Sequence, residues 1–454
     1  MSARGSARGR GGDGPLTLVL YNLLTSQLRQ TNLDHLNAFR DFGAGRYFYL
    51  NMGVRSVPDW LRKVDFDAVI FTTSFLGQRW VPSLFEEQRE RVRPLLGVGR
   101  ARIATPQDEF IRTAMLCDFF EEFGVNHVVS VAPESEWPKI YAGLDFDEVS
   151  FTRALTGYLS EPTVARIDEI VAQTPGRDLD IGYRARPGAP WLGRHGLLKG
   201  ELGAAVAEQG GERGLSFDIS SDDADVLVGD EWFRFLARSR YTIGVEGGAS
   251  VLDRDGSFKE ATEAFVEENP DASFDQIEAA CFPGEDGGVE LFALSPRHLE
   301  ACATRTCQLL VEGDYNGILR PGEHYLELKR DLSNLDQVLD RVVDDSERAA
   351  IVERAHRDVV SSGRYSYRAY VREIEAEIER LAPPLGAPAW KDARVRQPVA
   401  NLVDRASWIR VSLVGKPRPR FSRLMRTVLP ARVVNFFSKR LFGEALADRL
   451  AGIK

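Results

Sequence analysis

Four cationic side chains lie close together in the segment DIGYRARPGAPWLGRHGLLKG, residues 180–200. Arg184 and Arg186 come where an expected strand ends. Arg194 and Lys199 follow in the loop that leads into an expected helix. Cationic side chains and the free N–H groups of a helix N-terminus both stabilise phosphate groups. The segment therefore predicts a diphosphate site, although arginines dispersed over an exposed loop would give the same pattern.

A glycine turn follows in YTIGVEGGASVLDRDGS, residues 241–257, where an apolar strand runs into Gly247 and Gly248. Two glycines let backbone amides approach a ligand closely, and the hydroxyl of Ser250 can bond a phosphate. A plain strand-to-loop turn is the alternative. The DRDG run has the Asp-x-Asp spacing of some Mg²⁺ or Mn²⁺ sites, but hard cations need several oxygen ligands, so we expect no metal site.

Glu300 lies in an expected short helix within residues 294–331, among the small side chains of Ala301, Cys302 and Ala303. A carboxylate in such a place could accept hydrogen bonds from the two hydroxyls of a ribose. Most glutamates instead lie on a solvated helix face, which is the alternative.

The elements that must position these residues alternate between strands and helices. Apolar, β-branched runs predict strands in the first half at 16–24, 46–52, 66–76, 102–110 and 126–133, with helical segments between them. The alternation restarts after TPGRD, residues 174–178, and the stretch LRPGEHYLEL is expected to turn into an edge strand. Such alternation is typical of parallel βαβ units. The sequence thus predicts two α/β domains facing a cleft, with ligands beyond the carboxyl ends of the strands.

Composition narrows the class of protein. The chain has 454 residues, 43 % hydrophobic and 28 % charged, which is ordinary for globular proteins and long enough for about three domains. Its four cysteines form no CxxC pair, and no run of about 18 apolar residues occurs. Residues 416–454 hold ten Lys or Arg and two Asp or Glu, a charge of +8, so the other 415 residues carry −17. We therefore expect no nucleic-acid partner.

The basic C-terminal end has a pattern of its own. Cationic residues alternate there with apolar residues at a spacing of three to four, and Pro430 separates two such runs. The spacing predicts amphipathic helices that lie on an anionic membrane surface. Docking on the protein itself or on a second subunit is the alternative.

The segments quoted above resemble GT-B glycosyltransferases, in particular the retaining bacterial group 1 and CgeB-like branch. The resemblance covers about residues 16–375. Its strongest part is RHLEACATRTCQLLVEGDYNGILRPGEHYLELKRDLSNLDQVLD. It implies two Rossmann-like domains, and we expect a flexible leader (1–14), an acceptor domain (15–174), a nucleotide-sugar domain (175–381) and a linker with a basic tail (382–454).

The resemblance also assigns roles to residues. It implies that Glu300 binds the ribose of the nucleotide and that Arg194 and Lys199 hold its diphosphate, although Arg184 or Arg186 could take over part of that role. The residues expected to contact the diphosphate are Arg184, Arg186, Arg194, Lys199, Gly247, Gly248 and Ser250. Those expected to contact the sugar are Glu290, Arg297 and His298.

One position departs from the family. Many retaining members carry a second glutamate eight residues before the ribose-binding one, and this chain has Phe292 there. Either Glu246 or Glu290 replaces it, or the sugar is held differently.

The expected activity is transfer of a sugar from a nucleoside-diphosphate sugar to a hydroxyl acceptor, in surface polysaccharide or glycan synthesis. We expect it to be retaining, without metal or cofactor, and cytoplasmic, at the inner face of the membrane if the basic tail binds lipid. If the reaction is inverting, a base for the acceptor hydroxyl would come from His35, Asp108 or Glu109, and Glu246 is a further catalytic candidate. The alternatives are a nucleotide-sugar epimerase or hydrolase of the same fold and a catalytically silent scaffold.

Overall fold

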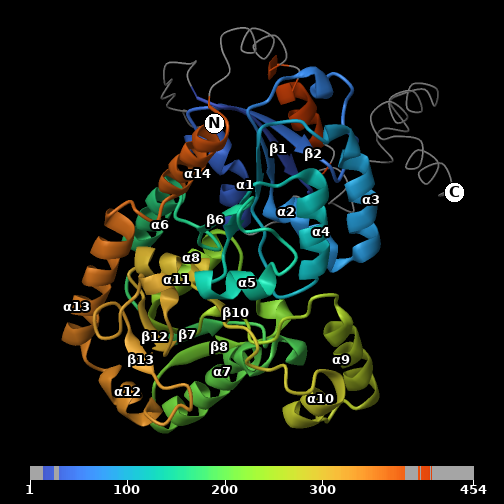
Figure 1. The fold of residues 1–454 in the computed structure, drawn as a ribbon. Coiled ribbons are helices and arrows are strands. Elements are labelled where there is room, and N and C mark those ends of the chain that lie inside the picture. Colours follow the sequence, from blue (N-terminus) through green and yellow to red (C-terminus); the bar gives the residue numbers. More distant parts are fainter. Residues whose placement is uncertain (1–13, 25–29, 384–396, 399, 409–410, 412–454) are drawn as a thin grey trace, which may run out of the picture.

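The protein folds into two α/β domains, seen one above the other in Figure 1. The computed structural model describes residues 14–24, 30–383, 397–398, 400–408 and 411. The leader up to residue 13 and the basic tail from residue 412, for which we predicted flexibility and membrane helices, lie outside the described residues. Two parallel sheets and their covering helices confirm the predicted α/β fold class with two Rossmann-like domains.

The first domain is built on a six-stranded parallel sheet in the order β2-β1-β3-β4-β5-β6. All six residues of β1 are buried, as expected for an apolar strand covered on both faces. The strands are β1 (Leu16–Tyr21), β2 (Arg46–Asn51), β3 (Ala68–Phe71), β4 (Ala101–Ala104), β5 (His127–Ser130) and β6 (Ser150–Arg153). The helices are α1 (Gln30–Phe42), α2 (Thr73–Leu76), α3 (Pro82–Val92), α4 (Thr113–Phe123), α5 (Trp137–Ile140) and α6 (Glu161–Gln173).

The second domain has a five-stranded parallel sheet in the order β13-β12-β9-β7-β8. Its strands are β7 (Leu179–Arg184), β8 (Phe217–Ser220), β9 (Ser239–Gly244), β12 (Cys307–Val311) and β13 (Leu326–Leu328), with β13 at the predicted edge. The helices that follow β7 are α7 (Arg194–Glu212), α8 (Asp230–Arg238), α9 (Ser257–Glu268), α10 (Phe274–Cys281), α11 (Pro296–Ala303), α12 (Leu335–Arg341), α13 (Asp345–Ala355) and α14 (Tyr367–Leu381). The strand order reverses between β7 and β9, which makes their carboxyl ends the topological switch point.

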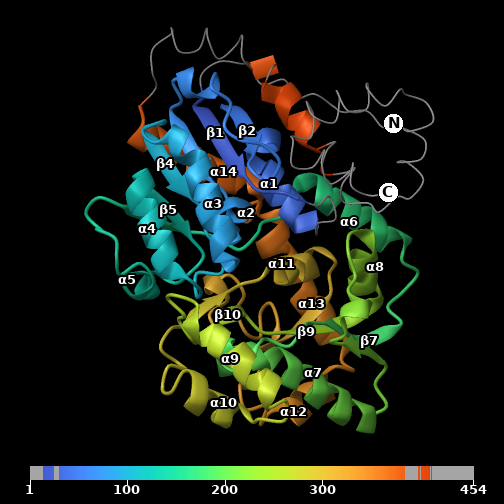
Figure 2. The ribbon, with the colours of Figure 1, turned by 90° about the vertical axis from the view of Figure 1, so that its right-hand side faces the viewer.

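Two helices pack against the other domain. Helix α6, which follows β6 of the first domain, packs on the second domain, and α14, which follows α13 of the second domain, packs on the first. Ile167 of α6 is fully buried in a cluster with residues of α8 and α11. Tyr370 of α14 is buried with residues of β1 and α1, and Figure 2 shows α14 behind the first domain. The chain therefore crosses between the domains twice, before the expected boundary at residue 174 and before the one at residue 381.

A further contact joins the domains through the segment that follows β9. Ile111 and Asp253 form a β-bridge, in which Asp253 N donates to Phe110 O at 2.8 Å. Trp191 packs edge-on against Trp80 with ring centroids 5.8 Å apart. A backbone bridge and apolar packing therefore both join the two domains on this side.

The end of the described chain docks on the first domain. Gln397 Nε2 donates to the carbonyl of Tyr47 on the edge strand β2 at 3.1 Å. Asp404 accepts hydrogen bonds from Tyr21 at 2.7 Å and Arg40 at 2.8 Å. The segment that precedes the basic tail is thereby anchored beside α1. Among the described residues, no helix combines the length and the apolar character that a membrane span requires.

Candidate functional site

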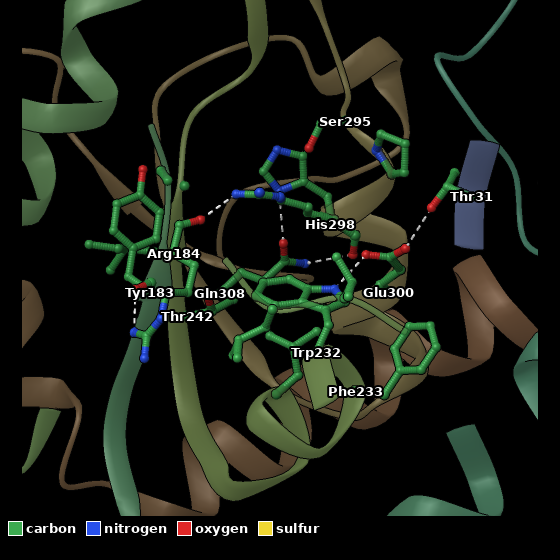
Figure 3. A pocket seen from close by; sticks show the side chains of 18 of the residues that line it. Thr31, Tyr183, Arg184, Trp232, Phe233, Thr242, Ser295, His298, Glu300 and Gln308 are labelled. Atoms are coloured by element: carbon green, nitrogen blue, oxygen red, sulfur yellow. Dashed lines mark hydrogen bonds between the residues drawn. The ribbon is translucent and has the colours of Figure 1, made fainter. Parts of the chain in front are cut away.

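A pocket of about 320 Å³ opens at the carboxyl ends of β7 and β9, at the switch point of the second sheet. Figure 3 shows it from close by, with α1 of the first domain at its edge. The side chains used below are contributed by α1, the end of β7, α7, α8, α11 and β12. They are Thr31, Arg184, Arg186, Lys199, Trp232, Arg297, His298, Glu300 and Gln308.

Four cations and one carboxylate line this pocket. Three of the cations are among those that the sequence grouped as a diphosphate site, namely Arg184, Arg186 and Lys199. Arg297, expected at the sugar, is the fourth, and its guanidinium donates to the carbonyl oxygen of Arg184. With Glu300 as the carboxylate, the lining carries a formal charge of +3, which favours a multiply charged anion.

Arg184 is fixed more firmly than the sequence suggests. Its Nη2 donates to Asp218 Oδ1 at 2.7 Å, and its Nη1 donates to the carbonyl of Asp218 at 2.9 Å. The guanidinium also lies 4.5 Å from the centroid of the Phe235 ring. Because these contacts hold the guanidinium group in one position, Arg184 acts on the pocket mainly as a fixed positive charge.

Arg194 does not line the pocket, unlike the other three cations of the predicted group. Its side chain forms an ion pair with Asp275, contacts Asp286 at 3.6 Å and covers the Phe274 ring at 4.5 Å. Its side chain is 59 % exposed. These partners on and after α10 draw the side chain away, so the structure corrects the predicted grouping by removing Arg194 from it.

Glu300 links both domains at the pocket. Thr31 Oγ1, at the start of α1, donates to Glu300 Oε1 at 2.9 Å, and Trp232 Nε1 donates to Oε2 at 2.7 Å. Figure 3 shows both hydrogen bonds converging on the carboxylate. A carboxylate oxygen can accept more than one hydrogen bond.

His298 is buried in the pocket wall and hydrogen-bonds through Nδ1 to Gln308 Oε1 at 3.0 Å. Burial lowers its pKa to about 4, so the imidazole is neutral near pH 7. It can therefore contribute a hydrogen bond or shape to the pocket, but no charge.

The two glycines of the predicted turn lie in a short strand that pairs closely with another strand. Gly247 and Gly248 form β10 (Gly247–Ala249), which pairs antiparallel with β11 (Leu291–Ala293). Gly248 has φ 125°, and a Cβ there would lie 1.7 Å from the carbonyl oxygen of Leu291. Ser250 Oγ donates to Asp286 Oδ1 at 2.6 Å. Close approach of two strands thus requires glycine, and neither glycine nor Ser250 lines the pocket.

Glu246 and Glu290 also lie outside the pocket lining. Glu246 is buried after β9, and its Oε1 accepts the backbone N–H of Tyr315 at 2.7 Å. Desolvation raises its pKa, which the Tyr315 hydrogen bond partly opposes. Glu290 is exposed just before β11. The carboxylate of Glu246 therefore holds the loop after β12.

Phe292, where the family pattern has glutamate, stacks on the ring of His195 with centroids 3.8 Å apart. His195 Nε2 hydrogen-bonds to the carbonyl of Glu246 at 3.1 Å, and Arg330 Nη1 donates to His195 Nδ1 at 3.4 Å. A protonated Nε2 and an accepting Nδ1 satisfy both contacts at once. Phe292 thus contacts the His195 ring and lies near the guanidinium of Arg330.

The candidate bases of the first domain lie apart from the pocket lining. His35 packs between Tyr367 and Tyr370 of α14, and burial lowers its pKa to about 4. Glu109 is fully buried, where it accepts the Val131 N–H at 2.8 Å and burial raises its pKa. Asp108 is exposed on the loop after β4.

The DRDG run caps a helix. Asp253 is buried, and its two carboxylate oxygens accept the backbone N–H groups of Gly256 at 2.8 Å and Lys259 at 2.9 Å, at the start of α9. Asp255 Oδ1 accepts the N–H of Ser257 at 2.9 Å. Within the part of the chain that the structure describes, no group of three or more His, Cys, Asp or Glu is arranged to hold a metal ion.

The sequence did not reveal three pocket residues that the structure brings in. Thr31 and Gln308 reach the pocket from α1 and β12, far away in sequence. Trp232 reaches it from α8. The apolar and charged residues of this helix lie on separate faces, a pattern in the sequence that could have indicated which side chains point inward.

Comparisons with known proteins give structural matches only. No family model matches the chain, and no curated protein matches its sequence. The fold is similar to Anabaena HepE in complex with UDP and glucose (10 % identity, 80 % of this chain, 100 % of that chain, TM-score 0.42). It is also similar to the α-glucosyltransferase AGT in complex with UDP (9 % identity, 80 % of this chain, 98 % of that chain, TM-score 0.44). A third similar structure is AviGT4, a glycosyltransferase involved in avilamycin A biosynthesis (11 % identity, 81 % of this chain, 98 % of that chain, TM-score 0.42).

Proposed function

We propose that this protein is a glycosyltransferase of GT-B fold that takes a sugar from a nucleoside-diphosphate sugar and transfers it to a hydroxyl acceptor. The observation that carries the proposal is the composition of one pocket. Arg184, Arg186, Lys199 and Arg297 supply positive charge, and Glu300 supplies a hydrogen-bond acceptor. A nucleoside diphosphate has the matching groups, an anionic diphosphate and a ribose diol.

The location of the pocket supports a transfer reaction. It lies at the switch point of the second sheet, and α1 of the first domain closes one side through the Thr31 to Glu300 hydrogen bond. A donor bound there has its sugar next to the cleft between the domains. An acceptor held by the first domain can then approach the sugar carbon.

The reaction breaks the bond between the sugar carbon C1 and the diphosphate oxygen, which leaves with the electron pair. The acceptor oxygen forms the new bond to C1 and loses its proton to a base. Negative charge therefore grows on the leaving diphosphate, and fixed cations stabilise it in the transition state. In this proposal Arg186 and Lys199 perform that role without a metal ion, since the carboxylates of Asp253 and Asp255 are used by backbone amides.

The finer features of the reaction belong to the same proposal. We propose retention at C1, an acceptor that is a glycan or lipid-linked sugar, and a cytoplasmic enzyme at the inner face of a membrane. The membrane location rests on the basic and apolar pattern of residues 416–454. Removal of residues 416–454 should lower binding to anionic vesicles and leave activity on a soluble acceptor unchanged. Equal vesicle binding would reject the membrane role.

A turnover experiment tests the activity. UDP-, GDP-, ADP- and dTDP-sugars are screened for a rise in melting temperature, since a ligand of the native state stabilises it. Any sugar nucleotide that binds is then incubated with and without glycan acceptors. We expect release of nucleoside diphosphate that depends on the acceptor. Equal release without acceptor would indicate a hydrolase, isomerised donor an epimerase, and no consumption a silent scaffold.

A further inference from the structure

Trp232 connects the two chemically different ends of the pocket. Its indole Nε1 donates a hydrogen bond of 2.7 Å to Glu300 Oε2. The guanidinium carbon of Arg297 lies 5.3 Å from the centroid of its ring. One side chain of α8 thus contacts both the carboxylate and one of the cations.

The contact to Glu300 fixes the direction of the carboxylate. Glu300 is in α11, and rotation about its side-chain bonds would otherwise let the carboxylate take several orientations. A charge-assisted hydrogen bond from a ring that cannot bend holds one oxygen in place. Thr31 bonds the other oxygen at 2.9 Å, but from the other domain. Trp232 is therefore a partner of Glu300 from its own domain.

The contact to Arg297 extends this arrangement toward the cations. Arg297 also donates to the carbonyl of Arg184, the residue at which β7 ends. Trp232 stacks near Phe235 on the same helix, with ring centroids 5.9 Å apart, and Phe235 lies under Arg184. The two aromatic residues of α8 thus each lie against one of these arginines.

From these contacts we infer that Trp232 is a positioning residue whose indole N–H orients Glu300 to select a ligand with a free ribose 2′,3′-diol. This inference rests on the proposed function and adds to it the residue that makes the diol a requirement. Trp232 acts through Glu300 and need not touch the ligand itself.

Trp232→Phe removes the N–H and keeps a ring for Arg297. Trp137→Phe is the matched control, because Trp137 Nε1 also makes one hydrogen bond, to Ala132 O at 3.2 Å, in the first domain. Calorimetry measures dissociation constants of UDP, GDP and ADP and of their 2′,3′-dideoxy counterparts. We expect wild type and Trp137→Phe to prefer the ribose form by about tenfold or more, and Trp232→Phe to lose at least about threefold of that preference.

Each outcome separates the inference from the function. A wild-type preference that Trp232→Phe keeps would overturn the inference and leave the function standing. Binding without preference for the diol in wild type would also overturn it. If wild type bound none of the nucleotides, the proposed function itself would fall.

A second measurement covers the case in which Trp232→Phe does not fold. In wild-type protein labelled with ¹⁵N in its seven tryptophans, the Trp232 indole signal is assigned by its shift in Glu300→Gln. We expect this signal to move when the ribonucleotide binds and to move much less with the dideoxy form. Equal movement with both forms would overturn the inference.

Discussion

Thr31 and Glu300 touch across the two domains, with the Thr31 hydroxyl 2.9 Å from Glu300 Oε1. The carboxylate that faces the cationic pocket is therefore also a contact between α1 and α11. A ligand that binds Glu300 lies at the junction of the domains, where its far end can meet a second substrate. We therefore expect substitution of Glu300 to weaken ligand binding.

Glu300→Ala should weaken nucleoside-diphosphate binding by about 1–3 kcal/mol, because a ligand hydroxyl loses a charged acceptor. Glu300→Gln keeps the size and a carbonyl acceptor and should lose less. Isothermal titration calorimetry measures both. Affinity that is unchanged in Glu300→Ala would reject the ribose role of this residue.

Lys199→Ala should weaken the same binding by about 1.5–3 kcal/mol, the range for a hydrogen bond to a charged group. Arg194→Ala is the control, because Arg194 belongs to the same segment but pairs with Asp275 outside the pocket. We expect its affinity to match wild type. Equal losses in the two variants would mean that the diphosphate binds elsewhere, near the start of α7.

His35 should make the fold sensitive to acid. Burial lowers its pKa to about 4, against an ordinary value near 6.5, so the unfolded chain binds the proton more readily. Its stabilising contribution is complete above pH 6.5 and falls as the pH drops toward 4. His35→Phe keeps an aromatic ring between Tyr367 and Tyr370. From pH 7 to pH 5 the variant should lose about 1–2 kcal/mol less stability than wild type, measured by urea unfolding. An identical loss would contradict the buried, neutral state of His35.

Arg112 should contribute to the joint between the domains. It is 6 % exposed, and it donates to the carbonyl of Asp255 and to Glu260 Oε1, each at 2.7 Å. Arg112→Ala should lower the free energy of unfolding by about 1.5–3 kcal/mol, since these hydrogen bonds involve a charged group. Arg93→Ala removes the ion pairs of an exposed side chain with Glu90 and Glu122 and should cost less than about 1 kcal/mol. A smaller effect at Arg112 than at Arg93 would show that the joint does not depend on it.

Much of the fold could be predicted from the sequence because apolar, β-branched runs are local signals. The run at residues 16–24 and the edge strand at 326–328 both form as expected. Strand β6 (Ser150–Arg153) was missed, since none of its four residues is buried and its polar composition gives no strand signal. The expected strand 66–76 ends at Phe71, and Thr73 begins α2. The return of α14 to the first domain depends on tertiary packing, which no local pattern encodes.

The grouping of residues around the pocket was predictable where neighbours in sequence decide it and unpredictable where a distant partner decides it. Arg184, Arg186 and Lys199 come together because the end of β7 and the start of α7 adjoin in any βαβ unit. Arg194 is drawn away by Asp275, which lies 81 positions later in the chain. The bonds from Thr31 and Trp232 to Glu300 span 269 and 68 positions, so only the folded chain reveals them.

The most direct test of the account is a crystal structure of the full chain with the nucleoside diphosphate that binds best. The account predicts the diphosphate in contact with Arg186 and Lys199 and the ribose hydroxyls on Glu300, between the two domains. A nucleotide bound in the first domain, or with its diphosphate on Arg194 and away from Lys199, would contradict it.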